Sequence, residues 1–182
     1  NIKEKTPLGI QANQYMAKGE LVPDEITVPM VVDRLNEDDS QAGAILDGFP
    51  RNLAQAEKLD EILAQKAKRV DLVINLTSPK DEIITRILNR RVCSNQGCKT
   101  TYNLTMHPPK VQGICDKCGG ELVQREDDSD EQAIQKRLEL YDEKTLPLVE
   151  FYSKKGVLRT EEISEKTGRL GKDVVDTIMK NI

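Results

Sequence analysis

Four cysteines within 26 residues constrain the fold of this chain more than any other feature. They form two close pairs, Cys93-x4-Cys98 and Cys115-x2-Cys118, and the chain has no other cysteine. Zinc is bound by thiolates that two tight turns deliver in pairs, and structural four-cysteine sites use the spacing Cys-x2–4-Cys. We therefore expect a metal, zinc or else iron, to hold together a small loop-rich unit.

Two disulfides are the alternative use of these cysteines. No secretory leader opens the sequence, so we expect a cytoplasmic protein. Thiols stay reduced in that compartment, which favours the metal site.

The composition is that of an ordinary soluble protein. Charged residues make up 32% and hydrophobic residues 37% of the 182 residues. No apolar run approaches the roughly 20 residues of a membrane-spanning helix, and a net charge of -4 argues against a dedicated nucleic-acid binder. We expect one domain with an insertion, acting as a monomer without a membrane or nucleic-acid partner.

Short apolar segments alternate with helical periods along the chain. Residues 44–46 and 70–76 are β-rich, and an amphipathic stretch follows each. This alternation predicts an α/β fold with a parallel sheet. A helix is predicted at 24–36, where Pro29 indicates a kink or a later start. Another helix is predicted to follow Ser78, which would be its N-cap, with Pro79 in the first turn. The other predicted elements are helices at 53–63, after Ser129, from Pro147 to Gly156 and at 174–179, and a late strand at 157–158.

Residues 92–128 form an insertion between two predicted helices, and arginines lie at both of its ends. Helical spacing places Arg86 and Arg90 together on one side of the preceding helix, with Arg91 at the end of that helix. Arg125 and Arg137 follow the cysteines. The pair Asp127-Asp128 beside Arg125 is either a solvated charge run or an ionic latch.

A possible ligand site follows the first predicted strand, in Asp47-Gly48-Phe49-Pro50-Arg51. Ligands gather at the carboxyl ends of parallel strands. Asp47 could hold the hydrated magnesium of a nucleotide, Gly48 lets the backbone approach a ligand, and Arg51 offers a fork for phosphate. A plain turn with a surface arginine is the alternative, and spacing alone does not separate the two.

These segments together resemble the adenylate kinases, which interconvert ATP plus AMP with two ADP. The resemblance covers essentially the whole chain and points to the long bacterial form, in which the insertion is a mobile zinc-bearing lid over ATP. The segments that carry it are Lys18–Glu25, Asp47–Arg51 with Gln55, Arg90-Arg91, His107-Pro108-Pro109, Cys115–Leu122 and Gln124–Asp128.

The resemblance implies a P-loop-kinase-like parallel sheet flanked by helices. Residues 1–22 would be a partial AMP-binding segment, 23–91 and 129–182 the core, and 92–128 the lid. The implied partners are ATP, AMP and ADP, with structural zinc and with magnesium bound to ATP.

The resemblance also implies a role for each matching residue. Leu21 and Val22 would line the adenine pocket of AMP, and Asp47 would orient magnesium through water. Catalysis would rest on arginines that stabilise the transferring phosphoryl group, together with Asp47. The remaining assignments are Gly48, Arg51 and Gln55 to the phosphate and base of AMP, Arg86 and Arg90 to ATP, Arg125 and Arg137 to the transferring group and AMP, and Cys93, Cys98, Cys115 and Cys118 to zinc.

Two features depart from the family pattern. No G-x-x-x-x-G-K-[ST] motif occurs, so the P-loop and the central first strand are not represented. We therefore expect residues 1–182 to lack kinase activity by themselves, which a coupled ADP-formation assay would test. The first cysteine pair has four intervening residues where the zinc-bearing relatives have two, and Gly97 is available to bend them.

A zinc-ribbon module that docks RNA or protein through its arginines is the alternative from another class. The acidic net charge and the lack of aromatics interleaved with the arginines disfavour it. Other nucleoside monophosphate kinases stay open within the enzyme class.

Overall fold

The computed structural model describes residues 6–16, 22–125, 128, 131–164 and 171–179. The chain divides into two compact units, each built from two segments. The first unit comprises Asn1–Val73 and Glu139–Arg159, and the second comprises Ile74–Leu138 and Thr160–Ile182. The described helices include none with both the length and the apolar composition that a membrane span requires.

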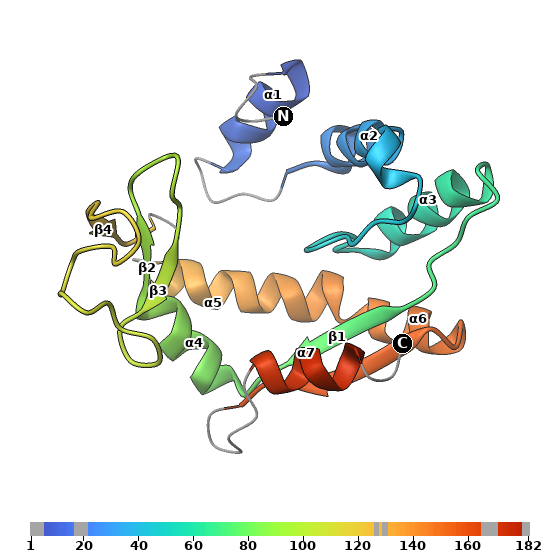
Figure 1. The fold of residues 1–182 in the computed structure, drawn as a ribbon. Helices are drawn as coiled ribbons and strands as arrows, with labels where there is room; N and C mark the ends of the chain where they lie inside the picture. The colour runs from blue at the N-terminus through green and yellow to red at the C-terminus, as the bar shows by residue number, and fades with distance from the viewer. Residues whose placement is uncertain (1–5, 17–21, 126–127, 129–130, 165–170, 180–182) are drawn as a thin grey trace. The chain divides into compact units, whose positions relative to one another are not determined.

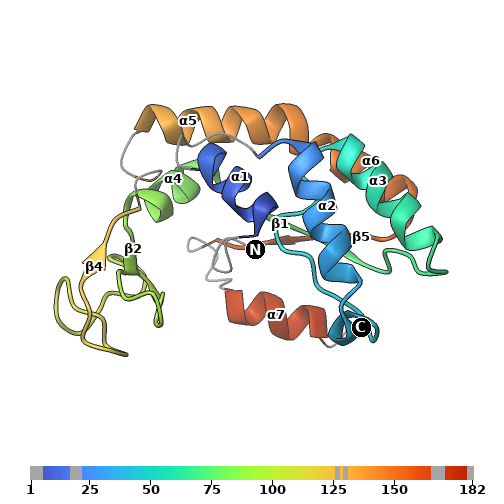
Figure 2. The ribbon, with the colours of Figure 1, turned by 90° about the horizontal axis from the view of Figure 1, so that it is seen from above.

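Figures 1 and 2 show the helices and strands of the described chain, in which four helical elements precede the first strand and β2, β3 and β4 follow one another. The helices are α1 (Pro7–Met16), α2 (Asp24–Leu35), the 3-10 turn η1 (Asp38–Ser40), α3 (Leu53–Ala64), α4 (Lys80–Leu88), α5 (Glu131–Leu140), the π-helical turn η3 (Tyr141–Thr145), α6 (Pro147–Lys154) and α7 (Gly171–Met179). The strands are β1 (Val73–Thr77), β2 (Arg90–Cys93), β3 (Thr101–Asn103), β4 (Leu122–Val123) and β5 (Leu158–Glu162).

Strands β1 and β5 form a two-stranded parallel sheet. The backbone N–H of Val73 donates to the carbonyl of Val157, and that of Ile163 donates to the carbonyl of Thr77, both at 2.8 Å. The residue numbers of both strands rise together along the pair, which is the parallel arrangement. The predicted α/β class with a parallel sheet flanked by helices is therefore confirmed.

The core of the first unit lies between α3, α6 and the beginning of this sheet. Ala56 of α3 is buried against Leu148 and Tyr152 of α6. The side chains of Val70, Val73, Phe151, Val157 and Leu158 pack around them. The apolar residues at helical spacing predicted for 53–63 supply one side of this core, and the helix predicted to begin at Pro147 supplies the other.

The second unit contains a small antiparallel sheet of order β3-β2-β4. Arg91 of β2 lies opposite Tyr102 of β3, and Val92 lies opposite Val123 of β4. Its core consists of the buried Cys93, Cys115 and Leu122, with Cys98 and Tyr102 packed against them. Cysteine side chains therefore make up most of this core, together with the aliphatic side chain of Leu122.

The predicted strand at 44–46 is wrong, because these residues form no strand. A strand needs a neighbour to satisfy its backbone groups, and no described residue pairs with this segment. The side chain of Ile45 is 97% exposed. The β-rich composition of the segment was therefore not sufficient to form a strand.

Both boundaries of α4 differ from the predictions, and one alternative for α2 is excluded. Helix α4 begins at Lys80 with Pro79 as its N-cap, because the backbone of Pro79 is extended (ψ 139°), so Ser78 is not the cap. Helix α2 begins at Asp24 and contains Pro29, so a later start is wrong. Helix α4 ends at Leu88, which places Arg90 in β2 and not on the helical face of Arg86. The predicted Ser129 cap lies outside the described residues.

Candidate functional site

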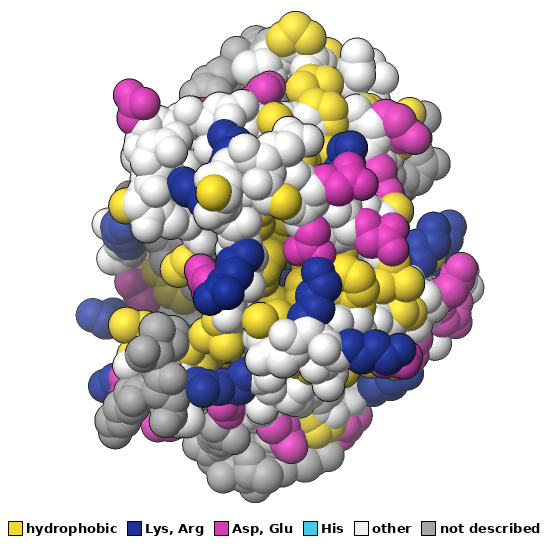
Figure 3. All heavy atoms as spheres, turned by 90° about the vertical axis from the view of Figure 1, so that its right-hand side faces the viewer, with side chains coloured by type: hydrophobic (Ala, Val, Ile, Leu, Met, Phe, Trp, Pro, Cys, Tyr) yellow, Lys and Arg dark blue, Asp and Glu magenta, His cyan; other side chains and the backbone are white. Residues whose placement is uncertain are grey.

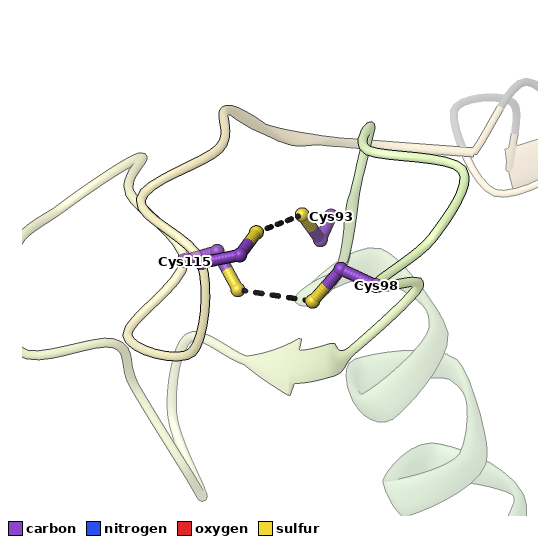
Figure 4. Close-up of side chains that lie close together, drawn as sticks. Cys93, Cys98 and Cys115 are labelled. Atoms are coloured by element: carbon purple, nitrogen blue, oxygen red, sulfur yellow. Dashed lines mark hydrogen bonds between the residues drawn. The ribbon is translucent and has the colours of Figure 1, made fainter.

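The four cysteine sulfurs converge at the centre of the β2–β4 unit, and Figure 4 shows three of them with their side chains pointing toward one another. All four sulfurs lie within 4.8 Å of one another. The Sγ atoms of Cys93 and Cys118 are 3.4 Å apart and those of Cys98 and Cys115 are 3.7 Å apart. A disulfide would need about 2.05 Å, so the disulfide alternative is wrong for this structure. Four thiolates around one zinc ion at about 2.3 Å would lie about 3.8 Å apart, which the cluster matches.

Two turns present these sulfurs. In the second pair, the N–H of Cys115 donates to the carbonyl of Gly120 and the N–H of Gly119 to the carbonyl of Cys115, both at 2.8 Å. Gly119 has φ +70°, the left-handed conformation that favours glycine. In the first pair, the N–H of Cys98 donates to the carbonyl of Asn95 (2.9 Å), and the side chain of Asn95 accepts from the N–H of Gly97 (3.0 Å). Asn95 thus closes the four-residue spacing into a turn.

Gly120 leaves room for the sulfurs. A Cβ added there would lie 3.1 Å from Sγ of Cys93 and 3.3 Å from Sγ of Cys118. The backbone at Gly120 therefore passes close to two of the candidate ligands, and a side chain there would crowd both sulfurs.

The thiols differ in acidity. The hydroxyl of Tyr102, 3.5 Å from the sulfur, lowers the pKa of Cys115 to about 6, and a contact with Thr100 lowers the pKa of Cys98. Burial raises the pKa of Cys93 to about 12. Thiolates are the ligands that zinc and iron prefer, so the donor set, its spacing and its turns fit the predicted metal.

A second constellation gathers arginines on one carboxylate. We call Arg90, Arg125, Arg137 and Asp128 the arginine cluster. Asp128 is fully buried, and Arg90 binds both of its oxygens, Nε to Oδ2 at 2.7 Å and Nη2 to Oδ1 at 2.6 Å. Arg137 of α5 contacts Oδ1 at 3.3 Å. The structure thus brings together arginines that precede and follow the cysteine segment.

The electrostatics of Asp128 are dominated by these cations. Burial by itself would raise the pKa of its carboxyl, but hydrogen bonds from Arg90 and the charges of Arg90, Arg125 and Arg137 outweigh burial and lower the pKa. Gln124 donates from Nε2 to the backbone carbonyl of Asp128 at 2.9 Å. A solvated charge run is therefore the wrong interpretation of Asp128, whereas Asp127 lies outside the described residues.

Arg86 and Arg90 line one pocket of about 260 Å³ in the second unit. Arg86 comes from α4, where its guanidinium lies 3.5 Å from Glu82 Oε2. The other lining residues are Ile87, Thr101, Tyr102, Asn103, Met106 and His107. The two arginines meet at this pocket although Arg86 lies in α4 and Arg90 lies in β2.

The Asp47–Arg51 segment forms a tight turn in the first unit. Nε of Arg51 donates to the carbonyl of Gly48 at 2.7 Å, and a Cβ on Gly48 would lie 3.0 Å from Nη2 of Arg51. Gly48 also has φ +70°. Asp47 is exposed. Two constraints therefore favour glycine at position 48: the positive φ angle, and the guanidinium of Arg51 in the space that a side chain would need.

Gln55 is a nearly buried polar residue of this unit, at 4% exposure. Its Nε2 donates to Oδ1 of Asp24 at 2.6 Å, and its Oε1 accepts from the backbone N–H of Arg51 at 2.7 Å. Asn52 caps α3 by accepting from the N–H of Gln55 at 2.8 Å and donates to both oxygens of Asp24. Asp24 and Asn52 were not predicted as site residues, although the position of Asn52 directly before a helical period is an N-cap signal.

The two residues implied for the adenine pocket are only partly visible. Val22 is half-buried and its carbonyl accepts from Thr27 Oγ1 at 3.3 Å. Leu21 lies outside the described residues.

The face drawn in Figure 3 carries acidic and basic side chains interspersed with one another.

Comparisons with known proteins match this chain to one family. The family model described as "Adenylate kinase" matches residues 1–157. An adenylate kinase of Bacillus subtilis (strain 168) is 54% identical over 157 residues, which are 86% of this chain and 71% of the relative. That of Geobacillus sp. (strain WCH70) is 52% identical over 158 residues, 87% of this chain and 72% of the relative. That of Staphylococcus aureus (strain Mu50 / ATCC 700699) is 46% identical over 177 residues, 97% of this chain and 81% of the relative. On these matches the chain belongs to the adenylate kinase family.

Proposed function

We propose that this chain contributes the AMP site and the lid to reversible phosphoryl transfer from MgATP to AMP, giving two ADP. The observation that carries the proposal is the arginine cluster, in which Arg90 and Arg137 contact the same anionic oxygen, Oδ1 of Asp128. Guanidinium groups held on one carboxylate are arranged as they would be on a phosphate oxygen.

The chemistry explains why several arginines are needed. In phosphoryl transfer, charge spreads over the equatorial oxygens of the transferring group, and catalysis is mainly positioning and electrostatic stabilisation. Arg90, Arg125 and Arg137 supply that positive charge from separate elements. Arg86 and Arg90 would bind ATP at their shared pocket, and Asp47 would hold, through water, the magnesium that accompanies ATP.

The first unit supplies the AMP site. Arg51, held beside Gly48, takes the phosphate, and Gln55 takes the base together with Val22 and Leu21. Arg125 and Arg137 are assigned to the phosphate of AMP as well.

The lid consists of residues 92–128. The core consists of residues 23–91 and 129–182, and residues 1–22 are part of the AMP-binding segment. A lid excludes water, which would otherwise accept the γ-phosphoryl group in place of AMP. Zinc bound by the four cysteines makes this small segment rigid. We assign the protein to the cytoplasm as a monomer that has ATP, AMP and ADP as its ligands and no nucleic-acid partner.

The test is calorimetric titration of the purified chain with a bisubstrate dinucleotide, two adenosines joined through five phosphates. Binding is measured because it does not depend on turnover. We expect one saturable site per chain that AMP and ATP each compete for. Binding of single-stranded RNA in place of the dinucleotide would overturn the proposal and favour the zinc-ribbon alternative.

A further inference from the structure

The hydrogen bonds around Gln55 fix which way its side-chain amide points. A glutamine amide is a donor at Nε2 and an acceptor at Oε1, and its two orientations are nearly equal in shape. Here a carboxylate oxygen of Asp24 faces one end at 2.6 Å and the N–H of Arg51 faces the other at 2.7 Å. An ionised carboxylate only accepts and an N–H only donates, so both partners select the same orientation.

The carboxylate of Asp24 is itself held in place. Nδ2 of Asn52 lies 3.2 Å from Oδ1 and 3.1 Å from Oδ2, while Oδ1 of Asn52 accepts from the N–H of Gln55. Every donor in this ring meets an acceptor. Flipping the Gln55 amide would convert two hydrogen bonds of a nearly buried group into two repulsive contacts, which is costly where water cannot compensate.

A fixed amide can distinguish purines at position 6. Oε1 keeps a second lone pair and Nε2 a second hydrogen beyond the bonds described. The Watson–Crick edge of adenine offers a 6-amino donor beside the N1 acceptor, whereas hypoxanthine reverses both roles with a 6-oxo acceptor and an N1–H donor. An amide that cannot flip can therefore form both hydrogen bonds with one of these bases, and it would place donor against donor and acceptor against acceptor with the other.

We propose that Asp24 is a positioning residue that sets base specificity, because it orients the Gln55 amide for a 6-amino purine and against a 6-oxo purine. This inference rests on the proposed function, in which Gln55 takes the base of AMP. Asp24 contacts Gln55 and not the nucleotide, so its effect is on the ratio of affinities rather than on catalysis.

The test compares the dissociation constants of AMP and IMP by calorimetry for the wild-type chain, Asp24→Asn and Glu25→Gln. An asparagine at position 24 can either donate or accept, so it removes one of the two constraints on Gln55. Glu25 is exposed and lies beside Asp24 in the first turn of α2. Glu25→Gln therefore removes the same charge from the same helix end without a change at Gln55.

We expect the wild type and Glu25→Gln to prefer AMP, and Asp24→Asn to lose at least about tenfold of that preference. Thermal melting shows whether each variant is folded. Where Asp24→Asn is unfolded, Asp24→Ser replaces it, because a hydroxyl also both donates and accepts.

The outcomes separate this inference from the function on which it rests. The role of Asp24 is overturned if a folded variant at position 24 keeps the wild-type ratio of AMP affinity to IMP affinity. It is also overturned if the wild type binds both nucleotides equally. Neither result contradicts the proposed nucleotide site. A wild type that binds neither nucleotide overturns the proposed AMP site, and the inference falls with it.

Discussion

Arg90 and Asp128 are joined by two short hydrogen bonds although 38 residues separate them in the chain. The carboxylate is fully buried, whereas the side chain of Arg90 is only partly buried. The pair ties the strand that precedes the cysteine segment to the residues that follow it. The two ends of the insertion are thereby held together within the second unit.

Replacing Asp128 by asparagine should destabilise the protein. The substitution leaves Arg90 and Arg137 without their shared anion, and breaking a buried ion pair costs about 3 kcal/mol. Urea unfolding measures the change. Asp71→Asn is the matched control, because Asp71 and its partner Arg69 are 81% and 86% exposed, and it should change the free energy of unfolding by less than about 0.5 kcal/mol. Equal effects of the two variants would contradict the prediction.

The same pair should make stability depend on acid pH. The pKa of Asp128 is lower in the folded chain than its unfolded value of about 3.9, so the folded state binds fewer protons. The stabilisation is therefore complete above the unfolded pKa and is lost as pH falls through the folded pKa. Urea midpoints of the wild type should decrease more steeply than those of Asp128→Asn below about pH 4, and parallel curves would refute this.

Metal should be stoichiometric and should stabilise the cysteine segment. Elemental analysis of the purified protein should find one zinc per chain. Cys115→Ser should lose that metal and melt this segment before the rest of the protein, because no aliphatic core replaces the thiolates. Hydrogen exchange locates the loss of protection. Ser94→Ala, next to a ligand, is the control, and an unaltered melting profile of Cys115→Ser would count against the site.

Gly120→Ala should weaken zinc binding about 10- to 100-fold, since its methyl group would be 3.1 Å from Sγ of Cys93. Competition with a chromophoric chelator measures the affinity. Gly97→Ala lies in the same segment, where a Cβ would meet only Asn95 Oδ1 at an ordinary 3.5 Å. It should bind zinc as the wild type does, and the prediction fails if both variants lose affinity alike.

Arg137→Ala should weaken binding of the bisubstrate dinucleotide about 10- to 100-fold with little change in melting temperature. Its contact with Asp128 is long at 3.3 Å and its side chain is partly exposed, so its loss costs little stability. A desolvated contact with phosphate is worth more. Arg69→Ala removes an exposed arginine and should leave affinity unchanged. Unchanged affinity in Arg137→Ala would remove this residue from the proposed site.

Elements that depend on local signals could be predicted from the sequence. Helical spacing predicted α3, and Pro147 with Gly156 bracketed α6, because periodicity and end residues act within a few positions of the chain. The two close cysteine pairs predicted a four-sulfur cluster for the same reason. Family motifs recognised in the sequence agreed with the comparisons.

Contacts between residues far apart in the sequence could be identified only in the folded structure. It showed that residues 44–46 form no strand, since strand formation depends on a partner and not on β-rich composition. It also buried Asp128 between arginines from both ends of the insertion and set Asp24 against Gln55, 31 residues away. Such pairings depend on which surfaces pack together, and no spacing within the sequence encodes that contact.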